Sequence, residues 1–155
     1  MAASVAAITG FILLLSVLEP ICVMQGWHRA AQSINWPIGL ICHQLPDRCC
    51  ELFGVRLAIC ARCFAFYSAM LLSSLLYLFS GIPRASISTR TLLVLVAPLA
   101  LDGMTQLCGL RTSTNALRTI TGLVAGVGTS LAILPFLTDK CVQSTIKIMK
   151  GGTGG

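Results

Sequence analysis

Charged residues are scarce in this chain of 155 residues. Asp, Glu, Lys and Arg together make up 10% of the sequence, and only five residues are acidic. A typical soluble domain carries roughly 25% charged residues, so the composition excludes a water-soluble globular domain of this size. Disorder needs low hydrophobicity and a coiled coil needs regular charge. With 55% hydrophobic residues and a mean hydropathy of +0.86, the chain fits neither class.

The sequence also lacks a run of basic residues, although its net charge is +6. Nucleic-acid-binding proteins gather positive charge in a patch, so we expect no nucleic-acid partner. Scattered basic residues beside apolar segments are typical of contacts with anionic lipid head groups. No Lys or Arg precedes Arg29, whereas a secretory signal peptide has a basic start. We therefore interpret the first apolar run as a retained membrane span.

Long apolar runs are what the sequence has in abundance. About 20 apolar residues cross a bilayer, and lipid leaves a helix to pair its own backbone groups. The predicted helical spans are residues 4–24, 57–79, 91–110 and 116–137. We predict an all-α, multi-pass integral membrane protein with one four-helix domain over residues 1–138 and a polar tail over 139–155. The bilayer is its expected partner, and a homo-oligomer is left open.

The connections between these spans indicate where a site would form. Residues 25–56 make a long, cysteine-rich first loop, and residues 111–115 make a tight third turn. Four crossings place these two connections on the same side of the membrane. The segment 42–63, the end of the third span and the start of the fourth are therefore expected at one face. Basic residues divide almost evenly between the two faces, so sidedness is left open.

Five of the eight cysteines lie within residues 42–63. Cys60 and Cys63 stand three apart where the second span starts, so both point to one helix face. Two thiolates at this spacing are half of a zinc site or a redox pair. Cys42 and His43 are further candidate ligands, and we expect one of them to bind, because neighbours in an extended segment point to opposite sides. Three ligands would leave zinc an open position. A disulfide role and unligated packing are the alternatives.

Asp102 lies inside the third predicted span, about 12 Å from its end. An ionised carboxylate facing lipid there would cost at least about 2.5 kcal/mol, so Asp102 is expected to face the bundle or a cation. Gln106 follows four residues later on the same helix face. Arg62, between the two cysteines, is an available partner. The candidate catalytic residues are Asp102, Gln106 and Arg62, and a structural ion pair is the alternative.

The third turn leads into a helix start rich in hydrogen-bond donors. Ser113 or Thr114 suits the N-cap, and the free backbone N–H groups and helix dipole favour an anion. Arginine side chains add planar donor forks for phosphate or carboxylate. The candidate anion-binding residues are Arg48, Arg111, Ser113, Asn115 and Arg118. The alternative is simple capping with contact to lipid head groups.

Four ordered blocks between Cys42 and Gly122 resemble domain-of-unknown-function family 2085, which comprises small prokaryotic integral-membrane proteins. The blocks are His43-Gln44-x-Pro46-x-Arg48, Cys60-Ala-Arg-Cys63, Leu101-Asp102-Gly103-x-Thr105-Gln106 and Arg111-x-Ser113-Thr114-Asn115-x-x-Arg118-x-x-Thr121-Gly122. The chain departs from the family pattern at Cys49-Cys50, where Ser and an aromatic residue are expected, and at Phe64-Ala65, where Thr-Gly is expected. The resemblance implies a polytopic protein of a prokaryotic cell membrane. It implies no activity.

Three functions are compatible with these features. The first is a metal-dependent enzyme or binding protein for an anionic head group or a lipid-linked phosphate. The second is thiol–disulfide redox chemistry, with Cys60 and Cys63 as the active pair and Cys42 as the resolving thiol. The third is a small carrier or an accessory subunit of a membrane complex. The sequence does not decide whether the protein is an enzyme.

Overall fold

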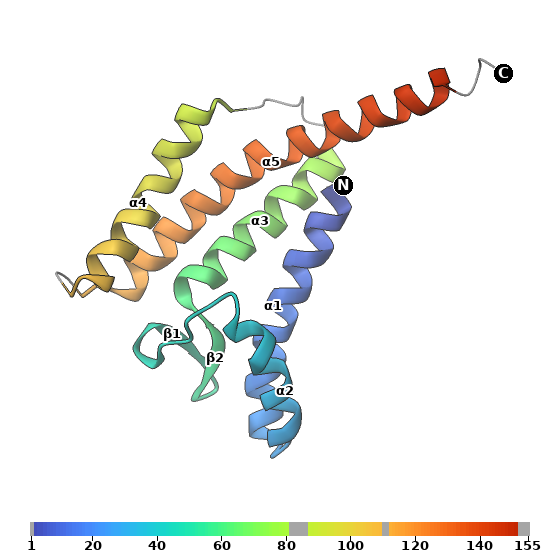
Figure 1. Cartoon of the computed structure of the whole chain (residues 1–155). Coiled ribbons are helices and arrows are strands. Elements are labelled where there is room, and N and C mark those ends of the chain that lie inside the picture. The colour runs from blue at the N-terminus through green and yellow to red at the C-terminus, as the bar shows by residue number, and fades with distance from the viewer. Residues whose placement is uncertain (1, 81–86, 110–111, 152–155) are drawn as a thin grey trace.

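The computed structural model describes residues 2–80, 87–109 and 112–151, the segment 139–151 by its backbone alone. Its elements follow one another as α1 (Ala2–Met24), α2 (His28–Gly39), a 3-10 turn η1 (Pro46–Arg48), β1 (Cys49–Leu52), β2 (Val55–Cys60), α3 (Ala61–Ser80), α4 (Thr89–Leu107) and α5 (Asn115–Gly151). Figure 1 shows that α1 and α4 run in one direction and that α3 and α5 run in the other.

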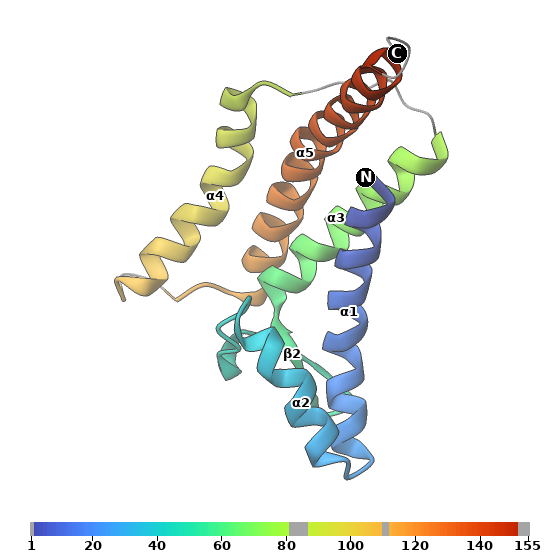
Figure 2. The ribbon, with the colours of Figure 1, turned by 45° about the vertical axis from the view of Figure 1, so that its right-hand side comes forward.

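The four long helices form an open bundle. Helix α3 packs between α1 and α5, and α4 packs against α5. Figure 2 shows the same order after a 45° turn. The C-terminal end of α4 and the N-terminal end of α5 consequently lie at the same end of the bundle as the start of α3. The predicted meeting of the first and third connections at one end agrees with this arrangement.

Three helices in the described part of the chain are long and apolar enough to cross a membrane. They are Ala2–Met24, Ala61–Phe79 and Asn115–Thr138. The four-span count is thus not confirmed. Helix α4 has 19 residues, about 28 Å at 1.5 Å per residue, but Arg90, Asp102 and Gln106 lower its apolar character. Whether α4 spans the membrane stays a prediction.

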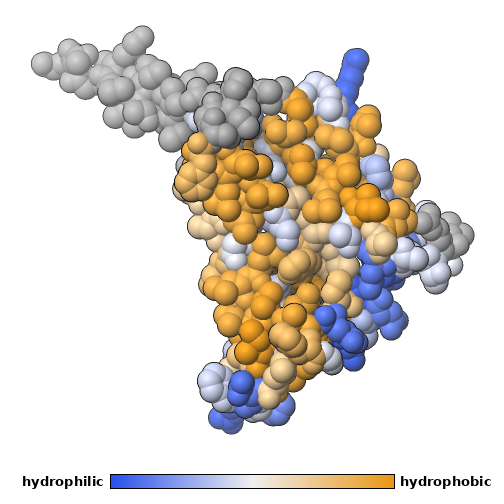
Figure 3. Space-filling view, turned by 180° about the vertical axis from the view of Figure 1, so that it is seen from behind, coloured by the Kyte–Doolittle hydropathy of each residue, from blue (hydrophilic) through white to orange (hydrophobic). Residues whose placement is uncertain are grey.

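The outer surface of the helices is apolar. Phe11 of α1, Leu72 of α3 and Val94 of α4 are each at least 60% exposed. Figure 3 shows this apolar surface along the helices, with most hydrophilic residues gathered toward the lower end. Such a large exposed apolar area is a liability in water but is the surface that lipid requires.

The first connection is not the irregular loop that we expected over residues 25–56. Most of it folds into α2, η1 and a two-stranded antiparallel sheet. Phe53 and Gly54 both have positive φ, at 53° and 79°, which matches the tight two-residue turn of a hairpin. Ile38 of α2 and Ile59 of β2 are almost fully buried in one small core. Tertiary packing against α1 therefore decides the structure of this segment.

Two helix boundaries differ from the prediction by more than three residues. Strand β2 continues to Cys60 and α3 begins at Ala61, so the expected helix start at residue 57 is wrong by four residues. The β-branched Val55 and Ile59 favour a strand here, and pairing with β1 supplies its hydrogen bonds. Helix α5 continues to Gly151 through most of the segment expected as a polar tail.

Candidate functional site

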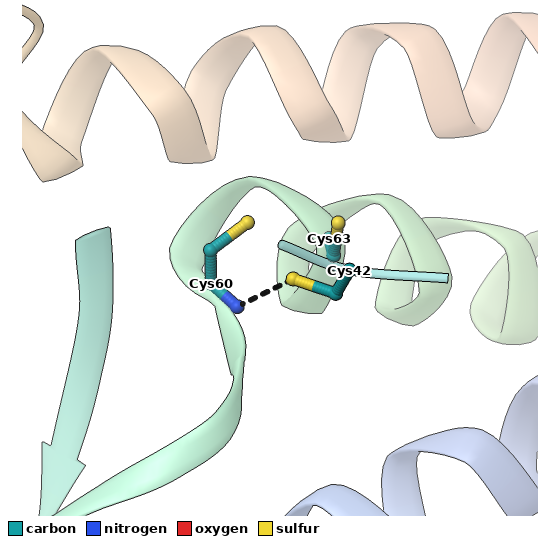
Figure 4. Close-up of side chains that lie close together, drawn as sticks. All are labelled: Cys42, Cys60 and Cys63. Carbon is teal, nitrogen blue, oxygen red and sulfur yellow. Dashed lines mark hydrogen bonds between the residues drawn. The ribbon is translucent and has the colours of Figure 1, made fainter. Parts of the chain in front are cut away.

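Three cysteines from three separate segments meet at the lower end of the bundle. Cys42 follows α2, Cys60 ends β2 and Cys63 lies in the first turn of α3. Their Sγ atoms all lie within 4.8 Å of one another, and Figure 4 shows the side chains gathered at the strand-to-helix junction. Tetrahedral zinc with Zn–S bonds of about 2.3 Å places its sulfurs roughly 3.8 Å apart. Small side-chain rotations would bring the three thiols to that spacing.

Hydrogen bonds already link the three thiols. The backbone N–H of Cys60 donates to Cys42 Sγ at 3.3 Å (Figure 4). Side-chain hydrogen bonds from Cys42 and Cys63 lower the pKa of Cys60 to about 2. The pKa of Cys42 is raised, chiefly by its side-chain hydrogen bond with Cys60. The first negative charge of the group therefore resides on Cys60, and a thiolate is the form that binds metal.

His43 does not join this group. Its side chain is exposed, although it lines the same cavity as the three thiols. The three-thiol group found in the described part of the chain consists of Cys42, Cys60 and Cys63. Which of the adjacent residues Cys42 and His43 binds an ion stays a prediction, and the geometry groups only Cys42 with the other two thiols.

The polar residues of α3, α4 and α5 form a chain of contacts beside the thiols. Arg62 donates to Asp102 in a largely buried ion pair. Gln106 donates to the backbone carbonyl of Asp102 at 2.7 Å. Arg118 in turn donates from Nη2 to Gln106 Oε1 at 3.2 Å. The three candidate catalytic residues are thus adjacent, and α5 is tied to the same network.

The structure places the predicted anion-binding residues in different surroundings. Arg118 is 6% exposed and its Nη1 donates to Asn115 Oδ1 at 2.7 Å and to the Asp47 carbonyl at 3.3 Å. Ser113 is buried, and its hydroxyl donates to the carbonyl of Thr114. Arg48 is half-buried and lines the cavity beside the thiols. Arg111 lies outside the described residues.

The start of α5 is capped as the sequence predicted. The Thr114 hydroxyl accepts a hydrogen bond from the backbone N–H of Leu117 at 3.3 Å, which is a typical N-cap contact. Because Asn115 bonds to Arg118, its side chain is engaged within the protein. The cap thus satisfies the backbone N–H of Leu117 at the helix start.

Close packing of α5 on α3 brings Arg118 to the thiols. A Cβ atom added at Gly122 would lie 2.4 Å from the Arg62 carbonyl, and one added at Gly126 would lie 2.5 Å from the Phe66 carbonyl. No side chain fits at such distances. The two glycines, four residues apart, allow the helix backbones to approach. Helix α5 therefore lies directly against the first turn of α3, next to the strand-to-helix junction that carries Cys60 and Cys63.

A cavity of about 220 Å³ unites these groups. Its walls include the side chains of Cys42, His43, Arg48, Cys60, Arg62, Cys63 and Arg118. Three cysteines and three arginines from distant parts of the sequence thus face one space. Asp102 is held just behind this wall through its bond to Arg62.

The structure also gives Cys49 and Asp47 roles that sequence reasoning missed. Cys49 lies directly across the hairpin from Cys60, and burial raises the pKa of its thiol to about 11. The Asp47 backbone carbonyl, not its side chain, accepts from Arg118. The strand register and the backbone contact both depend on tertiary structure. In the sequence, only the adjacent pair Cys49-Cys50 pointed to this segment.

Comparison with known proteins gives the chain its relatives. Residues 42–132 match the family described as "Predicted membrane protein (DUF2085)". An uncharacterized protein of Methanocaldococcus jannaschii, MJ1492, is 44% identical over 102 residues, which cover 64% of this chain and 65% of the relative. An uncharacterized protein of Methanothermobacter thermautotrophicus is 37% identical over 94 residues, which cover 61% of this chain and 83% of the relative. No solved structure matches the chain.

The matched segment begins at Cys42 and includes every residue of the cavity described above except Ile41. It spans more than half of the chain and confirms the resemblance that the four sequence blocks indicated. Together with the three apolar helices, the match identifies a multi-pass membrane protein with archaeal relatives. The chain belongs to the DUF2085 family of predicted membrane proteins.

Proposed function

We propose that the protein binds zinc through Cys42, Cys60 and Cys63 and that the ion faces a cationic cavity at the membrane surface. The single observation that carries this proposal is the meeting of three Sγ atoms within 4.8 Å on the wall of a cavity that also holds arginines. The protein would then bind, or act on, an anionic lipid head group or a lipid-linked phosphate.

Zinc is the metal that best fits the donor set. Thiolates are soft ligands, which favour zinc over magnesium or calcium. Three protein ligands leave one tetrahedral position open, and this is the arrangement of catalytic zinc sites. A bound zinc ion acts as a Lewis acid or lowers the pKa of a coordinated water. If His43 rotated inward, the fourth position would close and the site would be structural.

The neighbouring polar residues have separate tasks in this proposal. Asp102 holds Arg62 at the cavity wall through their ion pair, and Gln106 links Asp102 to Arg118. The guanidinium groups stabilise negative charge in the cavity, which is the main electrostatic task in reactions of phosphate or carboxyl groups. Asp102 Oδ1 has no hydrogen-bond partner, so this oxygen is available to accept a hydrogen bond.

The proposal includes a membrane topology. We infer that α4 is a fourth span, paired with α5, and that both chain ends lie opposite the site. The alternating direction of α1, α3, α4 and α5 supports this inference (Figure 1). Helix α4 would then need Asp102 inside the bundle, and its ion pair with Arg62 meets that need because paired charges cost less in a membrane.

Metal analysis of detergent-purified protein tests the metal site. We expect about one zinc ion per chain, and loss of that zinc in Cys60→Ser and Cys63→Ser, because each substitution removes one of three ligands. Cys108→Ser is the matched control, since Cys108 is exposed at the end of α4. Substoichiometric metal that the Cys60 and Cys63 substitutions leave unchanged would remove the proposal.

Thiol–disulfide exchange is the second candidate, and the hairpin register favours it. Cys49 and Cys60 are paired across β1 and β2. Opposite residues of an antiparallel pair have Cβ atoms about 4.5–5.5 Å apart, close to disulfide geometry. Mass mapping after alkylation discriminates the two functions. A redox protein cycles between free and bridged forms of Cys60, whereas thiols that stay free under a mild disulfide oxidant would argue against exchange.

A further inference from the structure

The cavity beside the thiols has more positive than negative charge. Arg48, Arg62 and Arg118 line it, and among the described residues only the Arg62–Asp102 pair forms an ion pair. One carboxylate, bonded to Arg62, and the Cys60 thiolate stand against three guanidinium groups, which leaves the cavity with a net positive charge. Buried or half-buried cations need an anion nearby, because desolvation alone disfavours their charge.

Two of these arginines also have hydrogen-bond donors with nothing to bind. The Nε atoms of Arg62 and Arg118 are buried and lack a partner. Arg118 as a whole is 94% buried, since it is 6% exposed. Buried donors are almost always satisfied in folded proteins, and each exception calls for a specific explanation. Both residues line the cavity, so an acceptor bound there, after a small rotation of either guanidinium group, would supply what the protein itself does not.

The helix start is not where this acceptor would bind. The side chains of Asn115 and Thr114 are engaged within the protein, whereas the unpartnered donors belong to residues of the cavity wall. Among the described residues, the positive charge beside the thiols thus lies between α3, α5 and the segment before β1. This moves the expected anion site from the turn at residues 111–115 to the space beside the cysteines.

We propose that this cavity binds a phosphate-type oxyanion held by Arg48, Arg62 and Arg118. A tetrahedral phosphate offers several acceptor oxygens and carries negative charge, which suits three planar donor forks and a cavity of net positive charge. A carboxylate has only two oxygens and one charge. The volume of about 220 Å³ accommodates a phosphate group with a short substituent. This assignment names the ligand class of the function proposed above. It rests on that function only where a metal beside the phosphate is invoked.

The rim of the cavity favours a phosphate that carries an apolar chain. Ile41 and Leu45 line the cavity and are 44% and 42% exposed. The adjacent Leu40 is 74% exposed. A cavity that holds arginines and has an apolar rim suits an amphiphilic molecule whose head group enters the cavity and whose tail stays in lipid. The shared chemistry is the phosphate group, and free phosphate is the other source.

Isothermal titration calorimetry in a neutral detergent tests this assignment with two probes. One probe is inorganic phosphate, and the other is dioctanoyl phosphatidic acid, a short-chain phosphomonoester lipid. Dioctanoyl phosphatidylcholine serves as the probe without net charge. We expect saturable binding of at least one phosphate probe and none of the zwitterionic lipid. Equal affinities would identify the phosphate group alone as the ligand, and preference for phosphatidic acid would identify a lipid head group.

Arg48→Gln is the informative variant, because Arg48 lies at the half-buried edge of the cavity. We expect Arg48→Gln to bind the phosphate probes about tenfold more weakly than the unsubstituted protein, or weaker still, since hydrogen bonds to charged groups contribute more than neutral ones. Arg48→Lys, which keeps the charge, should have a phosphate affinity between that of Arg48→Gln and that of the unsubstituted protein. Arg56→Gln is the matched control, because Arg56 is exposed on β2 and is absent from the cavity wall. Circular dichroism of each variant verifies folding.

The result that overturns the inference is the absence of saturable phosphate binding, or an equal loss in Arg48→Gln and Arg56→Gln. Zinc content measured on the same samples separates this failure from failure of the metal site. Cys63→Ser should lose zinc and still bind phosphate, because the arginines remain. If Cys63→Ser abolished phosphate binding as well, the anion would be held by the metal and the assignment to the three arginines would be wrong.

Discussion

Arg62 and Asp102 form an ion pair that joins α3 to α4 beside the three thiols. The side chains are 17% and 5% exposed, so the pair is shielded from water. It places the residue between Cys60 and Cys63 in direct contact with the polar centre of α4. The position of the cysteine junction and the position of α4 therefore depend on each other.

Breaking this ion pair should destabilise the bundle. Asp102→Asn leaves the guanidinium of Arg62 buried without a counter-charge, which costs about 3 kcal/mol or more. The double variant Arg62→Met/Asp102→Leu should be less destabilised than either single change, because no charge remains to be paired. Thermal unfolding in detergent measures the effect, with Glu51→Gln as an exposed control. Additive losses in the double variant would contradict a direct interaction.

Helix α5 should tolerate no side chain at Gly126. In Gly126→Ala the new Cβ would lie 2.5 Å from the Phe66 carbonyl and 2.8 Å from Ala69 Cβ, so the helices must separate at a cost of about 1–3 kcal/mol. Gly10→Ala is the control, because its Cβ would meet Leu71 at an ordinary 3.6 Å. We expect a lower unfolding temperature for Gly126→Ala alone. Equal stability of both variants would show that the α3–α5 approach is looser than described.

His43 should be dispensable for metal retention. Its side chain lies outside the three-thiol group, so His43→Ala is expected to keep the zinc content of the unsubstituted protein. Loss of zinc in His43→Ala would instead indicate a closed four-ligand site, since structural zinc is four-coordinate. Elemental analysis after exhaustive dialysis gives the answer, with Cys63→Ser as the variant expected to lose the ion.

Two cysteines of the hairpin should differ in their response to pH. In reduced, metal-free protein the pKa of Cys60 is lowered to about 2, so its thiolate persists in acid. The pKa of Cys49 is raised to about 11, so its thiolate fraction grows as pH rises. Between about pH 5 and pH 9 the alkylation rate should be flat for Cys60 and should increase for Cys49. Peptide mass spectrometry after iodoacetamide treatment measures both rates. Parallel profiles would argue against a charge centred on Cys60.

Topology can be read from the accessibility of single cysteines. Cys50 lies on β1 and Cys108 follows α4, and Figure 1 shows β1 and the C-terminal end of α4 at the lower end of the bundle. In single-cysteine variants a membrane-impermeant maleimide should label both from the same side of sealed vesicles. Labelling from opposite sides would mean that α4 does not cross the bilayer as proposed.

The sequence by itself determined the class of protein. Few charges and long apolar runs leave a helical membrane protein as the only solution, because lipid forces backbone groups to pair within a helix. Regular spacing along a helix also made local relationships visible. Asp102 and Gln106 share a face, and a helix cap is expected at Ser113 or Thr114, and both follow from period and residue type.

Tertiary structure decided the rest of the site. The fold of residues 25–56 into a helix and a hairpin depends on burial of Ile38 and Ile59 against α1, which no local pattern contains. Three further features join segments that are far apart in the sequence. Cys42 contributes to the thiol group, Cys49 is in register with Cys60, and Arg118 turns toward the cavity. Local pattern predicts the long apolar helices, but the distances between side chains on different helices are set only when those helices pack.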